Sequence, residues 1–533
     1  MKIWKAFAGI AIGASLAASA SAQGVPAVSD IVETEYGQVQ GLAADGIQRF
    51  LGLRYGAPPV GDLRFQPPAD PASWDGIADA TGMGAPCMQA YSPSGSRVSD
   101  FTRQMNTLFS TESEAKIDNE DCLFLNVWTP GTEGSRPVMV WFHGGGYAYG
   151  SGGWPAYDGA NLARRGDVVV VTINHRLNLF GFLNLTDIFG EEFAGADNAG
   201  NADLVQSLEW VRDNIAAFGG DPNNVTIMGE SGGGSKVSHM LATPSADGLF
   251  HRAIIQSGPG VISGNAEQAT GLARELLAEA GIETVEQLRA AHPEHLLSAM
   301  RAVLARHGEG FGGPNFGPIV DGNFLPRNPF VPTAPEQSND IPVMIGWNKD
   351  EMTLFTASQP WFGLIDDAAL DRMAATFGEN GPALIANYRE ENPDYSPTHI
   401  ANRAMSARFV QGSYILADAQ ARAGAPVYMY RLTWETPVNG GIFRSPHTLD
   451  IPMMFDNVEL SRVLVGPGEA PQRIADQMSE AWISFARTGT PSSDHLPDWP
   501  RYTPDSRMVM QFDLEPNVAD DPERGAREIL SGR

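Results

Sequence analysis

The chain has 533 residues, and with 43% hydrophobic and 19% charged residues its composition is that of a globular protein that can bury a large core. Its formal net charge of −27 argues against nucleic acids and anionic lipid surfaces as partners, because both bind proteins through clustered lysine and arginine side chains.

Residues 1–22 have the pattern of a secretory signal peptide. Residues 1–5 are basic, residues 6–18 are apolar and mostly small, and Ala20-Ser21-Ala22 forms an A-x-A cleavage site. The apolar run is too short to span a bilayer comfortably, and no later stretch approaches about 20 apolar residues. We predict cleavage after Ala22, export to a periplasm or to the medium, and no membrane anchor in the mature protein. The alternative is an uncleaved segment that anchors the chain.

The mature chain begins with short alternating segments between residues 31 and 53, which indicate an antiparallel β-meander. Two cysteines follow, Cys87 and Cys122, at the ends of a polar excursion with little periodicity. Their spacing is not C-x-x-C and no histidines accompany them, so an oxidising compartment favours a disulfide over a metal or redox site. Closing a loop of roughly 35 residues would contribute about 3–4 kcal/mol on the chain-entropy model.

From Leu123 onward, strands and helices alternate. Continuous apolar runs are typical of central strands covered on both faces, and they occur at residues 123–128, 138–142, 168–173 and 252–256. Apolar residues at helical spacing predict a helix over residues 202–218, which Gly219 and Gly220 end. This alternation predicts a large, mostly parallel sheet with helices on both faces.

The second half continues the pattern with more helices. We expect strands at residues 341–346 and 427–432, a helix at residues 470–487 and a final edge strand at residues 507–512. Helical segments fill about 265–310 and 360–425. No repeat or linker divides the chain, so we predict that residues 23–533 form one α/β unit with these two helical insertions.

Residues 225–234 read Val-Thr-Ile-Met-Gly-Glu-Ser-Gly-Gly-Gly, in which a β-branched run ends in G-x-S-x-G around Ser231. This pattern is typical of a nucleophile elbow, where the serine occupies a strained strand-to-helix turn. On its own it is weak, because a glycine-rich loop gives the same letters. A phosphate-binding loop does not fit, since Ser235-Lys236 follows Gly234 where Lys-Ser/Thr is required.

A serine nucleophile needs a base, and the base needs an acid that fixes its tautomer. Three histidines, His399, His447 and His495, lie well past the elbow, and His447 alone sits in a loop that enters an apolar segment. For the acid, Asp350 and Glu351 both follow an apolar strand and therefore lie at the carboxyl edge of the sheet. The residues by themselves leave the choice between these two carboxylates open.

The oxyanion that develops when a serine attacks a carbonyl group needs backbone N–H donors. Residues 141–147 (Trp-Phe-His-Gly-Gly-Gly-Tyr) follow an apolar strand and match the HGGG-type loop that supplies such donors. Gly232, directly after the serine, supplies another from the start of a helix.

With these motifs the chain resembles the type-B carboxylesterase/lipase family, the cholinesterase-like branch of the α/β-hydrolases, and within it the bacterial para-nitrobenzyl-esterase-like members. Residues 218–233 are similar to the family's serine signature without a gap, and residues 120–127 (Glu-Asp-Cys-Leu-Phe-Leu-Asn-Val) are similar to its upstream signature. The similarity extends from about residue 30 to the C-terminus. It implies an α/β-hydrolase fold with no metal and no cofactor.

Carried over to matching positions, the resemblance assigns the candidate site. It implies the catalytic residues Ser231 as nucleophile, His447 as base and Glu351, rather than Asp350, as acid. It also implies the oxyanion donors Gly145, Gly146 and Gly232, a serine beside the acid at Ser257, and the disulfide Cys87–Cys122.

The chain departs from the family in three places. Met352 replaces the glycine that usually follows the acid, so we expect an altered acid loop with a bulky side chain near the site. The loop between the cysteines has no tryptophan, which argues against a quaternary-ammonium substrate. Gly312-Gly313-Pro314 stands where cholinesterases carry bulky aromatics, and it predicts a wider acyl side.

We therefore predict an exported serine carboxylesterase that acts on a small-molecule ester through an acyl-enzyme. The alternatives are an amidase, a thioesterase or an acyltransferase with the same triad, because selectivity among these lies in the shape of the pocket. A further alternative is a non-catalytic recognition module of the same fold, although such relatives generally lack a triad member. The acidic surface is compatible with a monomer.

Overall fold

The computed structural model describes residues 27–89, 109, 117–307 and 315–531. The predicted signal peptide and its cleavage site lie outside the described residues. So do most of the excursion between the two cysteines and the segment Gly312-Gly313-Pro314.

The N-terminal part is an antiparallel meander that extends the edge of the main sheet. Strands β1 (Ala27–Thr34), β2 (Gly37–Ala44) and β3 (Ile47–Arg54) pair in chain order. Strand β3 then pairs with β5 (Phe124–Thr129), and the short β4 (Ile77–Asp79) pairs with β2. The predicted meander is therefore confirmed.

The main sheet has 13 strands within the described ranges, in the order β1-β2-β3-β5-β7-β6-β8-β9-β12-β13-β14-β15, with β4 beside β2. Every pair from β7 to β14 is parallel. The parallel strands are β6 (Arg136–Phe142), β7 (Val169–Ile173), β8 (Gly220–Glu230), β9 (Arg252–Gln256), β12 (Val343–Asn348), β13 (Val427–Leu432) and β14 (Met508–Phe512). The last strand in the order is β15 (Asn517–Asp520), which is antiparallel to β14. Strands β10 (Gly264–Asn265) and β11 (Ile319–Val320) form a separate pair.

Strands β6, β7 and β12 are buried along almost their whole length because both faces of the sheet are covered. Along β6, Val138, Val140 and Phe142 belong to one hydrophobic cluster, whereas Met139 and Trp141 belong to another, and all five side chains are fully buried. Successive side chains of a strand point to opposite faces, so the two clusters are the two sides of the sheet.

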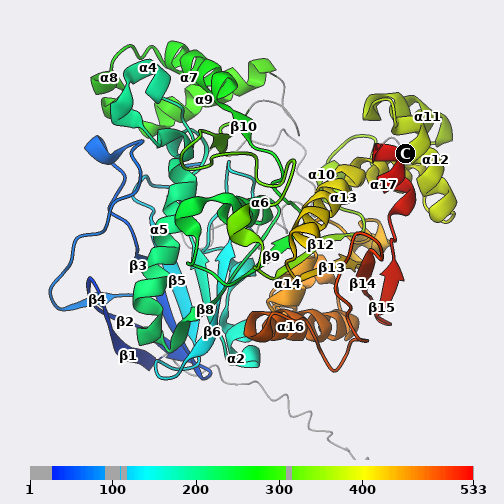
Figure 1. The fold of residues 1–533 in the computed structure, drawn as a ribbon, viewed down its shortest axis with the longest axis horizontal. Helices are drawn as coiled ribbons and strands as arrows, with labels where there is room; N and C mark the ends of the chain where they lie inside the picture. Colours follow the sequence, from blue (N-terminus) through cyan, green and yellow to red (C-terminus); the bar gives the residue numbers. More distant parts are fainter. Residues whose placement is uncertain (1–26, 90–108, 110–116, 308–314, 532–533) are drawn as a thin grey trace, which may run out of the picture.

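Helices supply the other half of each cluster. Helices α5 (Ala199–Asn214) and α6 (Gly232–Ala242) pack on the first side. Helices α2 (Ala160–Gly166), α14 (Asp450–Met454) and α16 (Ala470–Thr488) pack on the second. Figure 1 shows α5 and α16 lying against the sheet. The prediction of a mostly parallel sheet with helices on both faces is confirmed.

The helical segments of the second half have their own small cores. Helices α7 (Ala266–Ala280), α8 (Val285–Ala290) and α9 (Pro293–His307) gather beyond one end of α5, whereas α11 (Asp367–Ala374), α12 (Gly381–Glu391) and α17 (Arg524–Ser531) gather near the C-terminus (Figure 1). The long α13 (Pro397–Ala423) connects the latter group to the sheet. The remaining short α-helices of the described ranges are α3 (Asn178–Gly181), α4 (Thr186–Phe189), α10 (Met352–Thr356) and α15 (Arg462–Val465).

The prediction of a final edge strand at residues 507–512 is wrong. Strand β14 occupies those residues but pairs on both sides, in parallel with β13 and antiparallel with β15. Strand β15 has four residues, none fully buried, so it lacks the apolar alternation that reveals a longer strand. The predicted helix over residues 202–218 is present as α5 followed by a 3₁₀ turn at Ile215–Phe218.

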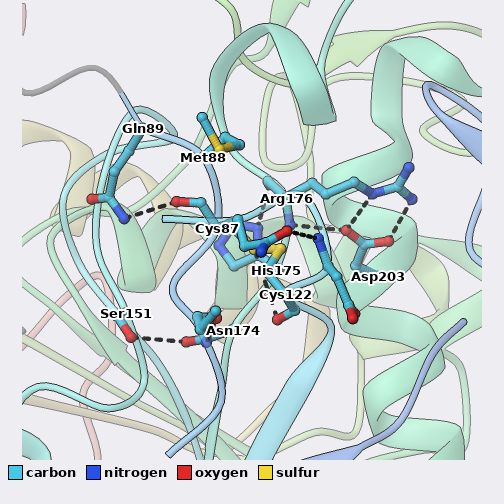
Figure 2. Close-up of a disulfide and its surroundings, with 12 residues drawn as sticks. Cys87, Met88, Gln89, Cys122, Ser151, Asn174, His175, Arg176 and Asp203 are labelled. Atoms are coloured by element: carbon cyan, nitrogen blue, oxygen red, sulfur yellow. Dashed lines mark hydrogen bonds and ion pairs between the residues drawn. A yellow bond between two sulfur atoms is a disulfide. The ribbon is translucent and has the colours of Figure 1, made fainter. Parts of the chain in front are cut away.

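The predicted disulfide between Cys87 and Cys122 is confirmed (Figure 2). Both cysteines are buried, and Gln89 donates a hydrogen bond from its side chain to the carbonyl oxygen of Cys87. The buried ion pair between Arg176 and Asp203 lies beside the bridge. The disulfide therefore joins the two ends of the excursion just before the start of β5, an interior strand of the sheet.

Candidate active site

Ser231 lies at the sharp turn between β8 and α6. Its φ of 58° and ψ of −122° are strained for a residue with a side chain, and its backbone N–H donates to the carbonyl oxygen of Gln256 over 2.8 Å. The flanking glycines make the turn possible, because a Cβ on Gly229 would lie 2.7 Å from the carbonyl oxygen of Phe142 and a Cβ on Gly233 would come closer still. The G-x-S-x-G pattern thus forms the predicted strand-to-helix turn.

The glycine loop after β6 lies against this turn. Gly145 and Gly146 have positive φ angles of 85° and 64°, which a residue with a side chain rarely adopts. A Cβ on Gly232 would collide with the backbone nitrogen of Gly146, so the two main chains are in direct contact. The structure therefore brings Gly146 and Gly232 together beside Ser231, with Gly145 adjacent in the loop.

His447 and Glu351 meet although 96 residues separate them. Nδ1 of His447 lies 2.5 Å from Oε2 of Glu351, and both side chains are buried. The other carboxylate oxygen of Glu351 accepts a hydrogen bond from the backbone N–H of Asn348 over 2.8 Å. The imidazole is thus oriented by a carboxylate that is itself held at the end of β12.

Asp350 faces away from this pair. Its Oδ2 accepts hydrogen bonds from the hydroxyl of Tyr395 over 3.3 Å and from the backbone N–H of Ser445 over 3.4 Å. Of the two carboxylates that the residues alone did not separate, Glu351 contacts His447.

The other two histidines lie elsewhere. His399 on α13 contacts Ser396 and the carbonyl oxygen of Ile442, and His495 is 53% exposed in its side chain. Ser257 is buried beside β9, where its N–H donates to the carbonyl oxygen of Gly346. Its hydroxyl has no hydrogen-bond partner among the described residues.

Met352 begins a helix directly after Glu351. The N–H of Met352 donates to the hydroxyl of Ser406 on α13 over 3.1 Å, which fixes the start of α10. One turn later Phe355 places its ring centroid 4.8 Å from that of His447, and Phe409 of α13 lies at 5.8 Å. Met352, which replaces the glycine usual in the family, is thus the first residue of α10. This helix holds Glu351 at its start and Phe355 one turn later, and both side chains contact the imidazole of His447.

Glu230 is the site residue that sequence reasoning missed. Its Oε1 lies 3.1 Å from Nε2 of His447, and its side chain is 1% exposed. Burial raises the pKa of Glu230 to about 8, with His447 opposing the shift and Asp450 and Glu351 adding to it. Burial by itself lowers the pKa of His447, but the carboxylates of Glu230 and Glu351 outweigh it and raise that pKa to about 9. The sequence offers one clue to Glu230, which is its place directly before Ser231. A strand-to-helix turn holds that residue next to the serine.

We expect the variant Glu230→Gln to shift the rise of kcat/KM with pH to lower pH by about 1–2 units. A base works only in its neutral form, so with His447 as the predicted base we expect activity to rise as pH passes the pKa of His447. Removing the charge of Glu230 removes one of the causes that raise this pKa. The measurement is kcat/KM for p-nitrophenyl butyrate between pH 5 and 10. Glu459 is exposed, so Glu459→Gln should leave the pH profile unchanged. An unshifted profile for Glu230→Gln would contradict the conclusion that Glu230 raises the pKa of His447.

The described residues contain neither a candidate metal centre nor a candidate membrane-spanning helix. No three or more His, Cys, Asp or Glu side chains in those ranges are grouped so that they could hold a metal ion. No helix in the same ranges is long and apolar enough to cross a membrane.

The sheet, with a serine turn after one parallel strand and a carboxylate after another, has the organisation of the α/β-hydrolase fold. A family model described as the carboxylesterase family matches residues 28–529. The para-nitrobenzyl esterase of Bacillus subtilis (strain 168) is 35% identical over 94% of this chain and 98% of that protein. The phenmedipham hydrolase of Pseudarthrobacter oxydans is 34% identical over 90% and 94% of the respective chains.

Among solved structures, the carboxylesterase EST55 of Geobacillus stearothermophilus matches with a TM-score of 0.79 and 40% identity, over 94% of this chain and 99% of that one. An esterase of Clostridium hathewayi matches with a TM-score of 0.79 and 33% identity, over 95% and 100%. The chain belongs to the carboxylesterase family, and it is a carboxylic-ester hydrolase.

Proposed function

We propose that the protein is an exported serine carboxylesterase that hydrolyses small-molecule esters with the triad Ser231, His447 and Glu351. The observation that carries this proposal is the buried contact of 2.5 Å between Glu351 and His447, in a chain whose serine occupies a strained turn beside a glycine loop. The pattern at residues 1–22 and the buried Cys87–Cys122 disulfide support export. We place all of the chemistry in a single catalytic unit, residues 23–533.

In the proposed reaction, the hydroxyl oxygen of Ser231 attacks the ester carbonyl carbon while Nε2 of His447 takes the hydroxyl proton. The N–H groups of Gly145, Gly146 and Gly232 stabilise the oxyanion that forms on the carbonyl oxygen.

His447 then gives its proton to the leaving alcohol, which departs and leaves an acyl-enzyme on Ser231. Water attacks the acyl-enzyme by the same steps and releases the acid. Glu351 keeps the proton on Nδ1, so that Nε2 is the nitrogen that exchanges protons with the substrate.

The proposal includes a preference for esters over amides and thioesters. The test uses an ester, an anilide and a thioester of butyric acid with the purified mature protein. We expect the ester to be hydrolysed at least about 100-fold faster than the anilide, and butyrate to be released in the same amount as the alcohol, since water is the acceptor. Equal rates on the anilide or the thioester, or transfer of the butyryl group to an added alcohol in preference to water, would contradict the proposal.

A further inference from the structure

Lys236 is a buried lysine on α6, five residues after the candidate nucleophile, and the reaction proposed above gives it no role. Its side chain is 0% exposed, and its Nζ donates a hydrogen bond to the carbonyl oxygen of His143 over 2.7 Å. Burial lowers the pKa of the ammonium group well below its ordinary value, and no carboxylate of the described residues offsets this effect. This is the lysine whose position after Gly234 does not fit a phosphate-binding loop.

A lysine without a carboxylate partner is costly to bury, because both its charge and its N–H donors lose water. The contact that Lys236 gains is with a backbone atom of one particular segment. His143 is the first residue of the glycine loop, and Lys236 lies on the helix that begins with Gly232. The lysine therefore links the two parts of the chain that carry the proposed oxyanion donors.

The other end of the glycine loop is attached to the same helix. The hydroxyl of Tyr147 lies 2.9 Å from the hydroxyl of Ser235 and 3.1 Å from Nδ1 of His239. Nζ of Lys236 lies 5.6 Å from the centroid of the Tyr147 ring. Both flanks of the loop, His143 and Tyr147, are thus held by side chains from the first two turns of α6.

The residues between these flanks have no side chains with which to hold themselves in place. Gly145 and Gly146 also have positive φ angles, so their conformation depends on the contacts around them. An oxyanion donor acts only when its N–H points at the developing charge, and a displacement of about 1 Å can cost about 100-fold in rate. The flanking contacts are therefore where the position of the donors is set.

We propose that Lys236 is a positioning residue that holds the glycine loop against the nucleophile helix, so that the N–H groups of Gly145 and Gly146 converge with that of Gly232. The inference rests on the proposed function. It assigns the lysine to the stabilisation of the transition state and not to the binding of the ester.

The test compares Lys236→Met, which fills the same space without a donor, with the wild-type mature protein. We expect kcat for p-nitrophenyl butyrate to fall about 10- to 100-fold while KM changes less than 3-fold. The affinity for an alkyl trifluoromethyl ketone should fall by a similar factor. The serine oxygen adds to this ketone, its proton goes to His447 and the ketone oxygen becomes an oxyanion, so binding reports on the donors directly.

Thr243→Val is the matched control, because Thr243 is a buried residue at the end of α6 whose hydroxyl bonds, within the described part of the chain, only to the carbonyl oxygen of His239. It should change neither kcat nor ketone affinity by more than 2-fold. Tyr147→Phe removes the other attachment, and we expect a smaller loss in the same two quantities.

A folded Lys236→Met protein with kcat and ketone affinity within 2-fold of the wild type would overturn the proposal, as would a rise in KM with unchanged ketone affinity. If this variant does not fold, Lys236→Leu, which also lacks a donor, must show the same parallel losses or the proposal fails. A wild-type protein without esterase activity would instead refute the proposed function, so the two failures are distinguishable.

Discussion

Replacing Ser231 with alanine is expected to lower kcat for p-nitrophenyl butyrate by about 10⁵- to 10⁶-fold. The variant loses the oxygen that forms the acyl-enzyme, whereas the glycine loop and the pair of His447 and Glu351 remain. The residual rate comes from substrate binding and the oxyanion donors, which still act on attack by water. The same variant should lose covalent labelling by an organophosphonate, which is measured as a mass increase of the intact protein.

The control for this prediction is Ser238→Ala, which removes a buried serine hydroxyl from the same helix. The hydroxyl of Ser238 bonds the carbonyl oxygen of Gly234 and the N–H of Gly260, and it has no part in the proposed reaction. This variant should keep its labelling and most of its activity. Full retention of either activity or labelling by Ser231→Ala would mean that another residue is the nucleophile.

The turn at Ser231 was predictable because its chemistry is local. A strand of β-branched residues, the serine and the close-packed glycines are consecutive in the chain, and each follows from the backbone geometry of one turn. The buried position of His447 was also predictable, since its loop leads into an apolar segment. That Glu351 and not Asp350 contacts it depends on which of two consecutive residues points inward after β12, and only the family resemblance predicted that choice.

The contact of Glu230 with His447 and the role proposed for Lys236 were both missed from the sequence, because they depend on contacts across the fold. Glu230 is an ordinary residue of the serine motif until His447, more than 200 positions later, comes within 3.1 Å of its carboxylate. Lys236 reads as a residue on a helix surface until the loop after β6 covers it. Strand β15 was missed for a related reason, since its place is set by pairing with β14 and not by its own composition.

The adjacent carboxylates Glu351 and Asp350 should give opposite results when each is changed to its amide. In Glu351→Gln, the N–H of Asn348 keeps the amide oxygen in the position of Oε1, because that position must accept a hydrogen bond. The amide NH₂ then faces Nδ1 of His447, which forces the imidazole proton onto Nε2. The base is thereby in the wrong tautomer, and we expect kcat to fall about 10³- to 10⁴-fold with a folded protein.

In Asp350→Asn, by contrast, the surroundings of the side chain accommodate the amide. Its Oδ2 position accepts from Tyr395 and Ser445, which an amide oxygen continues to do, whereas Oδ1 has no hydrogen-bond partner among the described residues and can become an NH₂. Burial raises the pKa of Asp350, so a neutral side chain is no harder to bury there than the carboxylate. We expect kcat within about 3-fold of the wild type, measured with p-nitrophenyl butyrate beside Glu351→Gln. Comparable losses in the two variants would show that the region, and not the carboxylate on His447, carries the effect.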